Sequence, residues 1–208
     1  LTITAGTGSV AFNGAVGGTT RLGVIDINSA NNVTAVAITA AALNQDAGSG
    51  TTTLNGAVNT NTAAGVTLTG TNLAVNQAIT TTANGIVTLN HTGTTNIAAA
   101  GDINADGAVP ITANGGITTA GDITTTNDDI QYASALVLAG DIAVSSGAGA
   151  GNITFANTVN GTAAGTEDLT ITAGTGSVAF NGAVGGTTRL GVIDINSANN
   201  VTAVAITA

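Results

Sequence analysis

The 208-residue chain is 43% hydrophobic but only 2% aromatic, and 11 acidic residues against two arginines and no lysine give it a formal net charge of −9. This charge argues against nucleic acid or anionic lipid as a partner, because both are bound mainly through Lys and Arg. The charge does not exclude a cation or a neutral sugar as a binding partner. The apolar content is too high for a disordered chain, and no apolar run reaches the roughly 18 residues of a membrane-spanning helix, so we expect a folded chain without membrane insertion.

Short β-strands are predicted along the whole chain. Gly, Thr, Asn and Val dominate where amphipathic helices would carry Leu, Glu, Lys and Arg, so helices are not expected. Alternating apolar and polar residues indicate strands, with Gly- and Asn-rich turns between them. In chain order the clearest are LTIT from Leu1, VIDI from Val24, VTAVAIT from Val33, VTLTG from Val66 and ITF from Ile153.

The opening segment, Leu1–Ala40, recurs without a change as Leu169–Ala208, so one repeat unit extends from position 1 to position 168. We therefore divide the chain into 1–168, one full unit, and 169–208, the start of the next identical unit. A repeat this long and this regular indicates a self-similar rod in which each segment packs mainly on its neighbours. The two parts are expected to form a single continuous solenoid.

A finer period lies inside the unit. Related phrases recur, such as FNGAV, LNGAV and the triplet GDI, and they divide the unit into eight segments. The aligned segments start at Leu1, Leu22, Ala41, Val66, Ile86, Pro110, Ile130 and Asn152. Their mean length is roughly 21 residues, which is within the range of solenoid repeats. Such a period without helices predicts an all-β parallel β-helix, with about eight coils per unit and about ten in the chain, roughly 48 Å long at about 4.8 Å per coil.

The most specific short motif is DINADG, which begins at Asp102. It matches the opening of a calcium loop, in which Asp102, Asn104 and Asp106 would supply oxygen ligands and Gly107 the sharp turn. The bidentate Glu that should follow is replaced by Ala113. The alternative is a polar corner after a strand, so calcium at Asp102, Asn104 and Asp106 is a hypothesis, and no other cofactor is indicated.

Three GDI triplets place Asp102, Asp122 and Asp141 about one coil apart. The carboxylates could stack along the rod, either bridged by a cation or, as we favour, outward and hydrated. A stacked Asp pair could also hydrolyse a glycosidic bond, but the aromatic and basic sugar-binding groups of such sites are scarce here. Four other acidic residues are expected to be solubilising turn residues: Asp128, Asp129, Glu167 and Asp168.

The remaining polar signals are weak. A Walker loop is excluded because the chain has no Lys, and no nucleophile or zinc motif occurs, so no catalytic residue is assigned and the chain is not expected to be an enzyme. His91 has no companion ligand and is expected at a surface or a turn. The Thr runs 51–53, 80–82 and 124–126 could form a flat face for ice or sugar. Five Asn-x-Thr sequons arise in a chain rich in both residues, at Asn32, Asn90, Asn152, Asn160 and Asn200.

Three phrases, AGNITFANTVNGT, LTITAGTGSVAFNGAVGGT and ALVLAGDIAV, resemble the strand repeats of very large bacterial surface proteins, the filamentous haemagglutinin-like and autotransporter-passenger adhesins. The resemblance covers essentially the whole chain but is one of composition and period. It implies a secreted, right-handed β-helix at the bacterial cell surface or in an extracellular fibre.

Two classes of function follow from this resemblance. In the first, the repeats are a stalk or filament that supplies length and rigidity, with the chain itself as the main partner. In the second, the lateral face of each repeat is an adhesive surface for a host or matrix glycan, multiplied for avidity. The scarcity of Trp, Tyr and Arg, the usual residues of binding hot spots, favours the stalk. End-to-end self-assembly into a filament is a further alternative.

Overall fold

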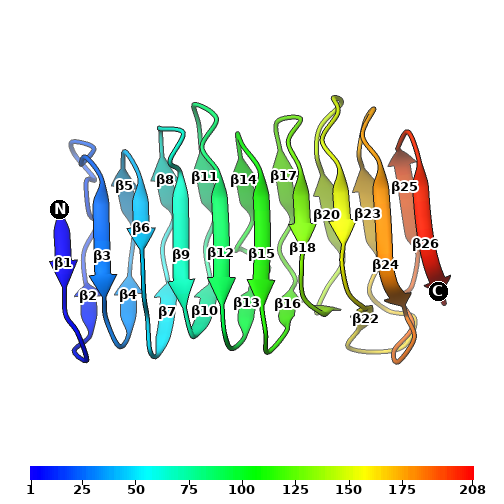
Figure 1. Ribbon diagram of the computed structural model, residues 1–208, viewed down its shortest axis with the longest axis horizontal. Helices are drawn as coiled ribbons and strands as arrows, with labels where there is room; N and C mark the ends of the chain where they lie inside the picture. Colours follow the sequence, from blue (N-terminus) through cyan, green and yellow to red (C-terminus); the bar gives the residue numbers. More distant parts are fainter.

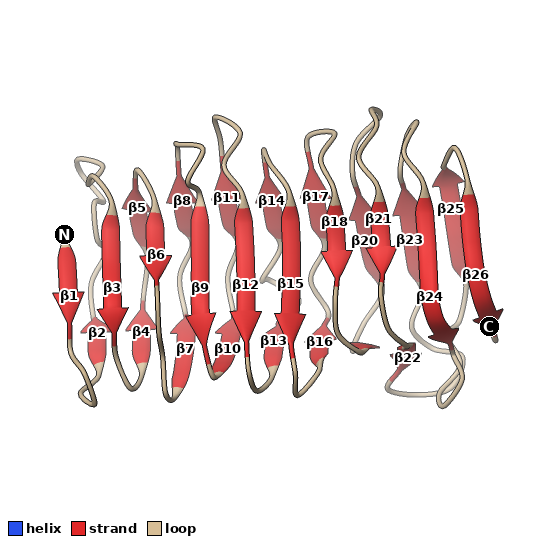
Figure 2. Ribbon diagram, in the orientation of Figure 1, coloured by secondary structure: helices blue, strands red, loops and turns tan.

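The computed structural model describes residues 1–208 as an all-β solenoid of 26 short strands without a helix (Figures 1 and 2). All strand pairs are parallel, and strands that follow one another in the chain lie on different sides of a rod whose two termini are at opposite ends. The predicted parallel β-helix is confirmed. It has about nine coils of roughly 22 residues, slightly fewer and longer than expected. The chain has no helix long and apolar enough to cross a membrane.

Three hydrogen-bonded ladders form the sides of the rod, and we call them faces 1, 2 and 3. Face 1 lies in front in Figure 1. It consists of β1 (Thr2–Thr4), β3 (Ile25–Ser29), β6 (Leu43–Gln45), β9 (Val66–Gly70), β12 (Val87–His91), β15 (Val109–Ala113), β18 (Ile130–Tyr132), β21 (Ile153–Phe155), and the first parts of β24 (Val178–Val184) and β26 (Val201–Ile206).

Faces 2 and 3 lie behind face 1. Face 2 consists of β2 (Val10–Phe12), β4 (Val33–Ala35), β7 (Thr51–Leu54), β10 (Asn72–Val75), β13 (Thr95–Ile97), β16 (Ile117–Thr119), β19 (Leu136–Leu138), β22 (Val159–Gly161) and the ends of β24 and β26. Face 3 consists of β5 (Ile38–Ala40), β8 (Val58–Thr60), β11 (Ile79–Thr81), β14 (Ile103–Ala105), β17 (Ile123–Thr125), β20 (Ile142–Ser145), β23 (Leu169–Thr172) and β25 (Ile193–Ser197).

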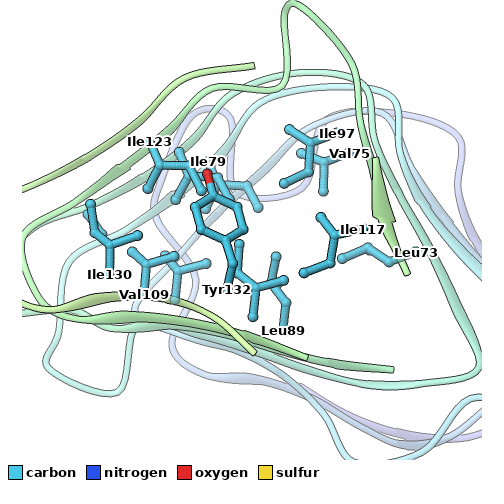
Figure 3. Packing of buried hydrophobic residues seen from close by; sticks show 14 of the residues in the cluster. Leu73, Val75, Ile79, Leu89, Ile97, Val109, Ile117, Ile123, Ile130 and Tyr132 are labelled. Atoms are coloured by element: carbon cyan, nitrogen blue, oxygen red, sulfur yellow. The ribbon is translucent and has the colours of Figure 1, made fainter. Parts of the chain in front are cut away.

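Alternation along each strand builds the core. In β5, for example, Ile38 and Ala40 are buried while Thr39 between them points outward. The inward residues form a single cluster of 41 buried side chains, in which Ile, Val and Leu from all three faces meet (Figure 3). Because like residues stack on like residues from coil to coil, the core is thin and continuous along the rod.

The aromatic residues are not scattered through this core. Tyr132, Phe155 and Phe180 follow one another on the inner side of face 1, with ring centroids 5.2 and 4.9 Å apart and nearly parallel planes. The fourth aromatic, Phe12, is the copy of Phe180 in the first coil and is only partly buried. The column therefore joins the end of one unit, at Tyr132 and Phe155, to the start of the next, at Phe180.

Close coil-to-coil contact at a corner gives a first testable prediction. A Cβ on Gly182 would lie 2.4 Å from the carbonyl carbon of Asn157 in the preceding coil, whereas a Cβ on its copy Gly14 would meet nothing within 4 Å. Gly182→Ala is therefore expected to lower the free energy of unfolding by about 1–3 kcal/mol, as overpacking does. Gly14→Ala is the matched control and should cost nothing. Urea midpoints of the two variants give the comparison, and equal losses would contradict the prediction.

Candidate functional site

The calcium motif lies along an extended strand. Asp102 precedes β14, Asn104 points outward from its centre, and Asp106 follows it, so the two outer carboxylates are about 13 Å apart at roughly 3.3 Å per residue. Calcium ligands lie about 2.3–2.6 Å from the ion. The structure thus does not bring the three side chains together, and no group of three or more His, Asp or Glu residues is close enough to hold a metal. Calcium stays a prediction, which thermal unfolding with calcium and with chelator tests.

The carboxylates at this corner are occupied by backbone amides of the following coil. Asp102 accepts a hydrogen bond from the amide of Asp122 at 3.0 Å, and Asp122 accepts one from Ala143 at 2.7 Å. A separate run begins two residues out of register, where Asp141 accepts from the Asp168 amide at 2.9 Å and Asp168 from the Val192 amide at 2.6 Å. The predicted column of Asp102, Asp122 and Asp141 is therefore present only in part: Asp102 lies beside Asp122, but the pairing of Ile123 with Val144 places Asp122 beside Ala143 and not Asp141. Each carboxylate ties its coil to the next one.

Asn and Asp side chains make the same kind of bond at the other corners. Asn32 accepts from the amide of Thr51 at 2.9 Å and Asn72 from Thr94 at 2.9 Å. Similar bonds are made by Asn127, Asp129, Asn152 and Asn160. We call all these side chains corner clips. These bonds are exposed to solvent, and the clips satisfy backbone donors where the ladders are interrupted.

The sequons are thus divided between two environments. Three of the five asparagines, Asn32, Asn152 and Asn160, are corner clips whose side-chain oxygens are engaged. Asn90 and Asn200 are exposed and outward. Nothing in this arrangement requires a sugar on any of them.

Glu167 differs from the expectation of a solubilising turn residue, because it is buried, with only 6% of its surface exposed. Its carboxylate accepts hydrogen bonds from the Thr162 hydroxyl and the Ala163 amide. The hydrogen bond from Thr162 holds the pKa of this carboxyl below its usual value. Glu167 closes the loop before β23, which is a structural role.

His91 was expected at a surface or a turn, and this expectation is wrong. The side chain is only 1% exposed at the inward-pointing end of β12, and neither ring nitrogen has a hydrogen-bond partner. Its ladder neighbours, Gly70 and Ala113, are small and leave room for an imidazole in the core. Burial lowers the pKa of His91 to about 4.

His91 therefore predicts a pH-dependent stability. In the unfolded chain the imidazole takes a proton below about pH 6.5, whereas in the folded chain it does so only near pH 4, so stability is complete above pH 6.5 and falls as the pH drops to 4. The loss from this group is at most about 3 kcal/mol. Urea titrations at pH 7 and pH 4.5 should show a smaller decrease for His91→Leu than for the parent. Equal decreases would mean that His91 does not contribute.

Two shallow surface hollows are present. The first, about 290 Å³, lies on face 3 and is lined by hydroxyl, amide and carboxylate side chains. Its lining residues are Thr80, Thr81, Thr82, Asn104, Ala105, Asp106, Thr124 and Thr126. The second, about 390 Å³, lies at the corner between faces 1 and 2 beside Asn114 and Ser134. Neither hollow contains a buried titratable pair of the kind that catalyses hydrolysis.

The three Thr runs are split between faces and do not form one array. The run from Thr51 lies on face 2, and the runs from Thr80 and Thr124 lie on face 3. The register of face 3 places Asn104 directly between Thr80 and Thr124. A hydroxyl- and amide-rich patch on face 3 is therefore present, but a pure Thr lattice is not.

Arg21 is a structural residue that the sequence pattern did not identify. Its guanidinium donates to the carbonyl of Ala40 at 2.7 Å, and to the carbonyl and side-chain oxygens of Asn59 at 2.9 and 2.5 Å. It thus holds the next two coils together on face 3. The copy, Arg189, is exposed in the last coils and has no such acceptors beside it. The one signal in the sequence was that Arg21 is the single Lys or Arg residue in the unit 1–168.

Comparisons with protein-family profiles, with curated proteins and with solved structures find no significant match.

Proposed function

We propose that this chain is a structural repeat segment of a secreted bacterial surface fibre or adhesin stalk, in which stacked units supply length and rigidity. The proposal rests on one observation. Residues 1–40 recur without a change as residues 169–208, and both copies belong to one continuous stack of coils. In the first copy the following coil buries the inward side chains, such as Val33 at 3% exposed and Ile38 at 1% exposed.

The strand pairing identifies the coil that packs on the first copy. Strands β6, β7 and β8 pair with β3, β4 and β5, so the segment Leu43–Thr60 forms the coil that buries the inward residues of 1–40. The second copy shows the other side of the junction. There β20, β21 and β22 pair with β23 and β24, so the segment Ile142–Gly161 lies against the start of the unit.

The two copies together therefore supply both halves of a unit-to-unit junction. A coil with the sequence of Leu43–Thr60 fits the open end at β25 and β26, which is the order that a tandem array would supply. Head-to-tail association of two identical chains would instead place β1 and β2 on that end. The exact repeat favours a continuous array over end-to-end assembly, and the strand repeats quoted above favour a cell-surface setting.

The test is a series of proteins with one, two and four complete units. Each added unit should lengthen the particle by about 37 Å, from the strand spacing and the roughly 22 residues per coil. Small-angle scattering and electron microscopy measure the length, and the urea midpoint should rise with unit number as in other solenoids. Particles that grow wider while keeping their length would contradict the proposal.

The second candidate, an adhesive lateral face, is favoured by the hydroxyl- and amide-lined hollow on face 3. Hydroxyl and amide side chains can form hydrogen bonds with the hydroxyl groups of a neutral glycan. Glycan-array binding by the same series separates the two functions, because an adhesive face predicts saturable binding that strengthens with unit number. If no glycan binds to a protein of any length, the adhesive face is ruled out and the stalk function is retained.

A further inference from the structure

The two copies of residues 1–40 have the same local pairing. Thr2 lies opposite Asp26 in the first copy, as Thr170 lies opposite Asp194 in the second. The bulge that follows each of these pairs is also shared. The next strands agree as well, since Val10 pairs with Val33 and Val178 with Val201. Within a copy, therefore, the chain folds the same way wherever it occurs along the rod.

The two copies nevertheless occupy different faces. In the first copy β1 and β3 belong to face 1, whereas their counterparts β23 and β25 belong to face 3. Likewise β2 and β4 lie on face 2, while their counterparts, the first parts of β24 and β26, lie on face 1. Every strand of the second copy is thus displaced by one face, in the same direction.

The displacement fixes the number of coils in a unit. Following the ladders from β1 to β23 gives seven full coils and two further faces, so the unit 1–168 contains seven and two-thirds coils. This corresponds to about 22 residues per coil, the mean length observed. The unit is one third of a coil short of eight whole coils. For this reason the strand that starts at Leu169 lies on face 3, whereas the equivalent strand after Leu1 lies on face 1.

We infer that successive units in the proposed tandem array are each rotated by one face, so that three units make 23 coils before a residue returns to its original side. This inference rests on the proposed function. A surface feature that occurs once per unit appears on each side of the rod in turn. The hydroxyl- and amide-lined hollow, on face 3 in the first unit, comes on face 2 in the second and on face 1 in the third.

The consequence concerns the partner that such a rod can bind along its side. Equivalent hollows on one side are separated by 23 coils, about 110 Å at the usual strand spacing. A flat, rigid surface such as a crystal or a membrane-bound glycan layer therefore meets only one unit in three. Flexible glycan chains that surround the rod can reach all of them. The rotation thus selects a surrounding, flexible partner for any lateral site that the unit carries.

A disulfide experiment tests the rotation at the junction, and the absence of native Cys gives a clean background. Ala143 lies directly beside Thr170 on face 3, and neighbouring parallel strands are close enough for a disulfide. If the unit held eight whole coils, Thr170 would instead lie on face 1 beside Thr154. We expect the pair Ala143→Cys with Thr170→Cys to crosslink readily, and the pair Thr154→Cys with Thr170→Cys to remain reduced. The opposite pattern overturns the inference.

A second measurement uses a four-unit protein and does not depend on disulfide geometry. Thr124→Cys, on an exposed residue of face 3, is introduced in units one and two or in units one and four and labelled with gold for cryo-electron microscopy. Labels on units one and four should lie on the same side about 110 Å apart, and those on units one and two on different sides. Labels that all lie on one side overturn the rotation but leave the stalk intact, whereas rods that fail to lengthen overturn both proposals.

Discussion

Replacing Phe180 by Ala is expected to lower the free energy of unfolding by about 3–5 kcal/mol, the range found for buried Phe-to-Ala changes. Phe180 is 1% exposed and stacks on Phe155, with ring centroids 4.9 Å apart. The change removes a ring from the end of the aromatic column and leaves a cavity that the stacked backbone cannot close. Urea unfolding followed by far-ultraviolet circular dichroism gives the loss. Fluorescence of Tyr132, the only Tyr, reports on the same column.

The chain supplies its own control for this substitution. Phe12 has the same neighbours in sequence as Phe180 but lies in the first coil, where no preceding ring stacks on it and the side chain is only partly buried. Phe12→Ala should therefore cost less than half as much as Phe180→Ala. When a unit is added before Leu1, Phe12 gains a copy of Phe155 beneath it, and the two costs should become equal. Equal costs in the unextended chain would show that the column does not stabilise the junction.

Replacing Arg21 by Met is expected to cost about 3 kcal/mol. Met retains an aliphatic side chain but removes three hydrogen bonds from a charged donor to Ala40 and Asn59, and single bonds to charged groups contribute about 1.5–3 kcal/mol each when partly shielded from water. The bonds join the first coil to the two that follow, so the loss should be largest at the N-terminal end. Amide hydrogen exchange locates this loss of stability: exchange at Thr39 and Asn59 should become faster, while exchange at Ile142 should not change.

Arg189→Met is the matched control, since Arg189 is exposed and has no acceptors in the following coils. It should leave the urea midpoint unchanged. Extending the chain after Ala208 with a copy of residues 41–62 restores a copy of Asn59 and should make Arg189→Met as costly as Arg21→Met. If Arg189→Met stays neutral in the extended chain, then the coil does not form over the open end.

The strands of face 1 could be located from sequence because their signals are local. The eight segment starts read from the sequence fall within three residues of the first eight strands of that face, from Thr2 to Ile153. Alternating side chains and Gly or Asn turns determine these positions without knowledge of the tertiary structure. The ninth start failed, because Leu169 begins a strand of face 3 and the next strand of face 1 begins at Val178. All three faces carry the same inward Val, Ile and Leu, so the pattern marks a strand without identifying its face.

The candidate site was harder to predict because its residues act across coils. The DINADG motif was read as a compact loop, but its residues form a strand, in which alternate side chains are about 7 Å apart. The corner clips were missed because a bond such as that from the Asp122 amide to Asp102 spans 20 residues. His91 was misplaced for a related reason, since the space that accepts it is created by Gly70 and Ala113 in other coils.

The arrangement of strands across the rod also determines how it responds to tension. Every strand runs across the long axis, and the two termini lie at opposite ends (Figure 1). A force applied to the two termini therefore acts on the hydrogen bonds of the terminal coils first, and the coils open one after another from the ends. Each coil that opens releases roughly 22 residues, or about 75 Å of extended chain, in exchange for about 5 Å of rod. A rod of this kind is therefore expected to lengthen many-fold under load as its coils unfold one after another.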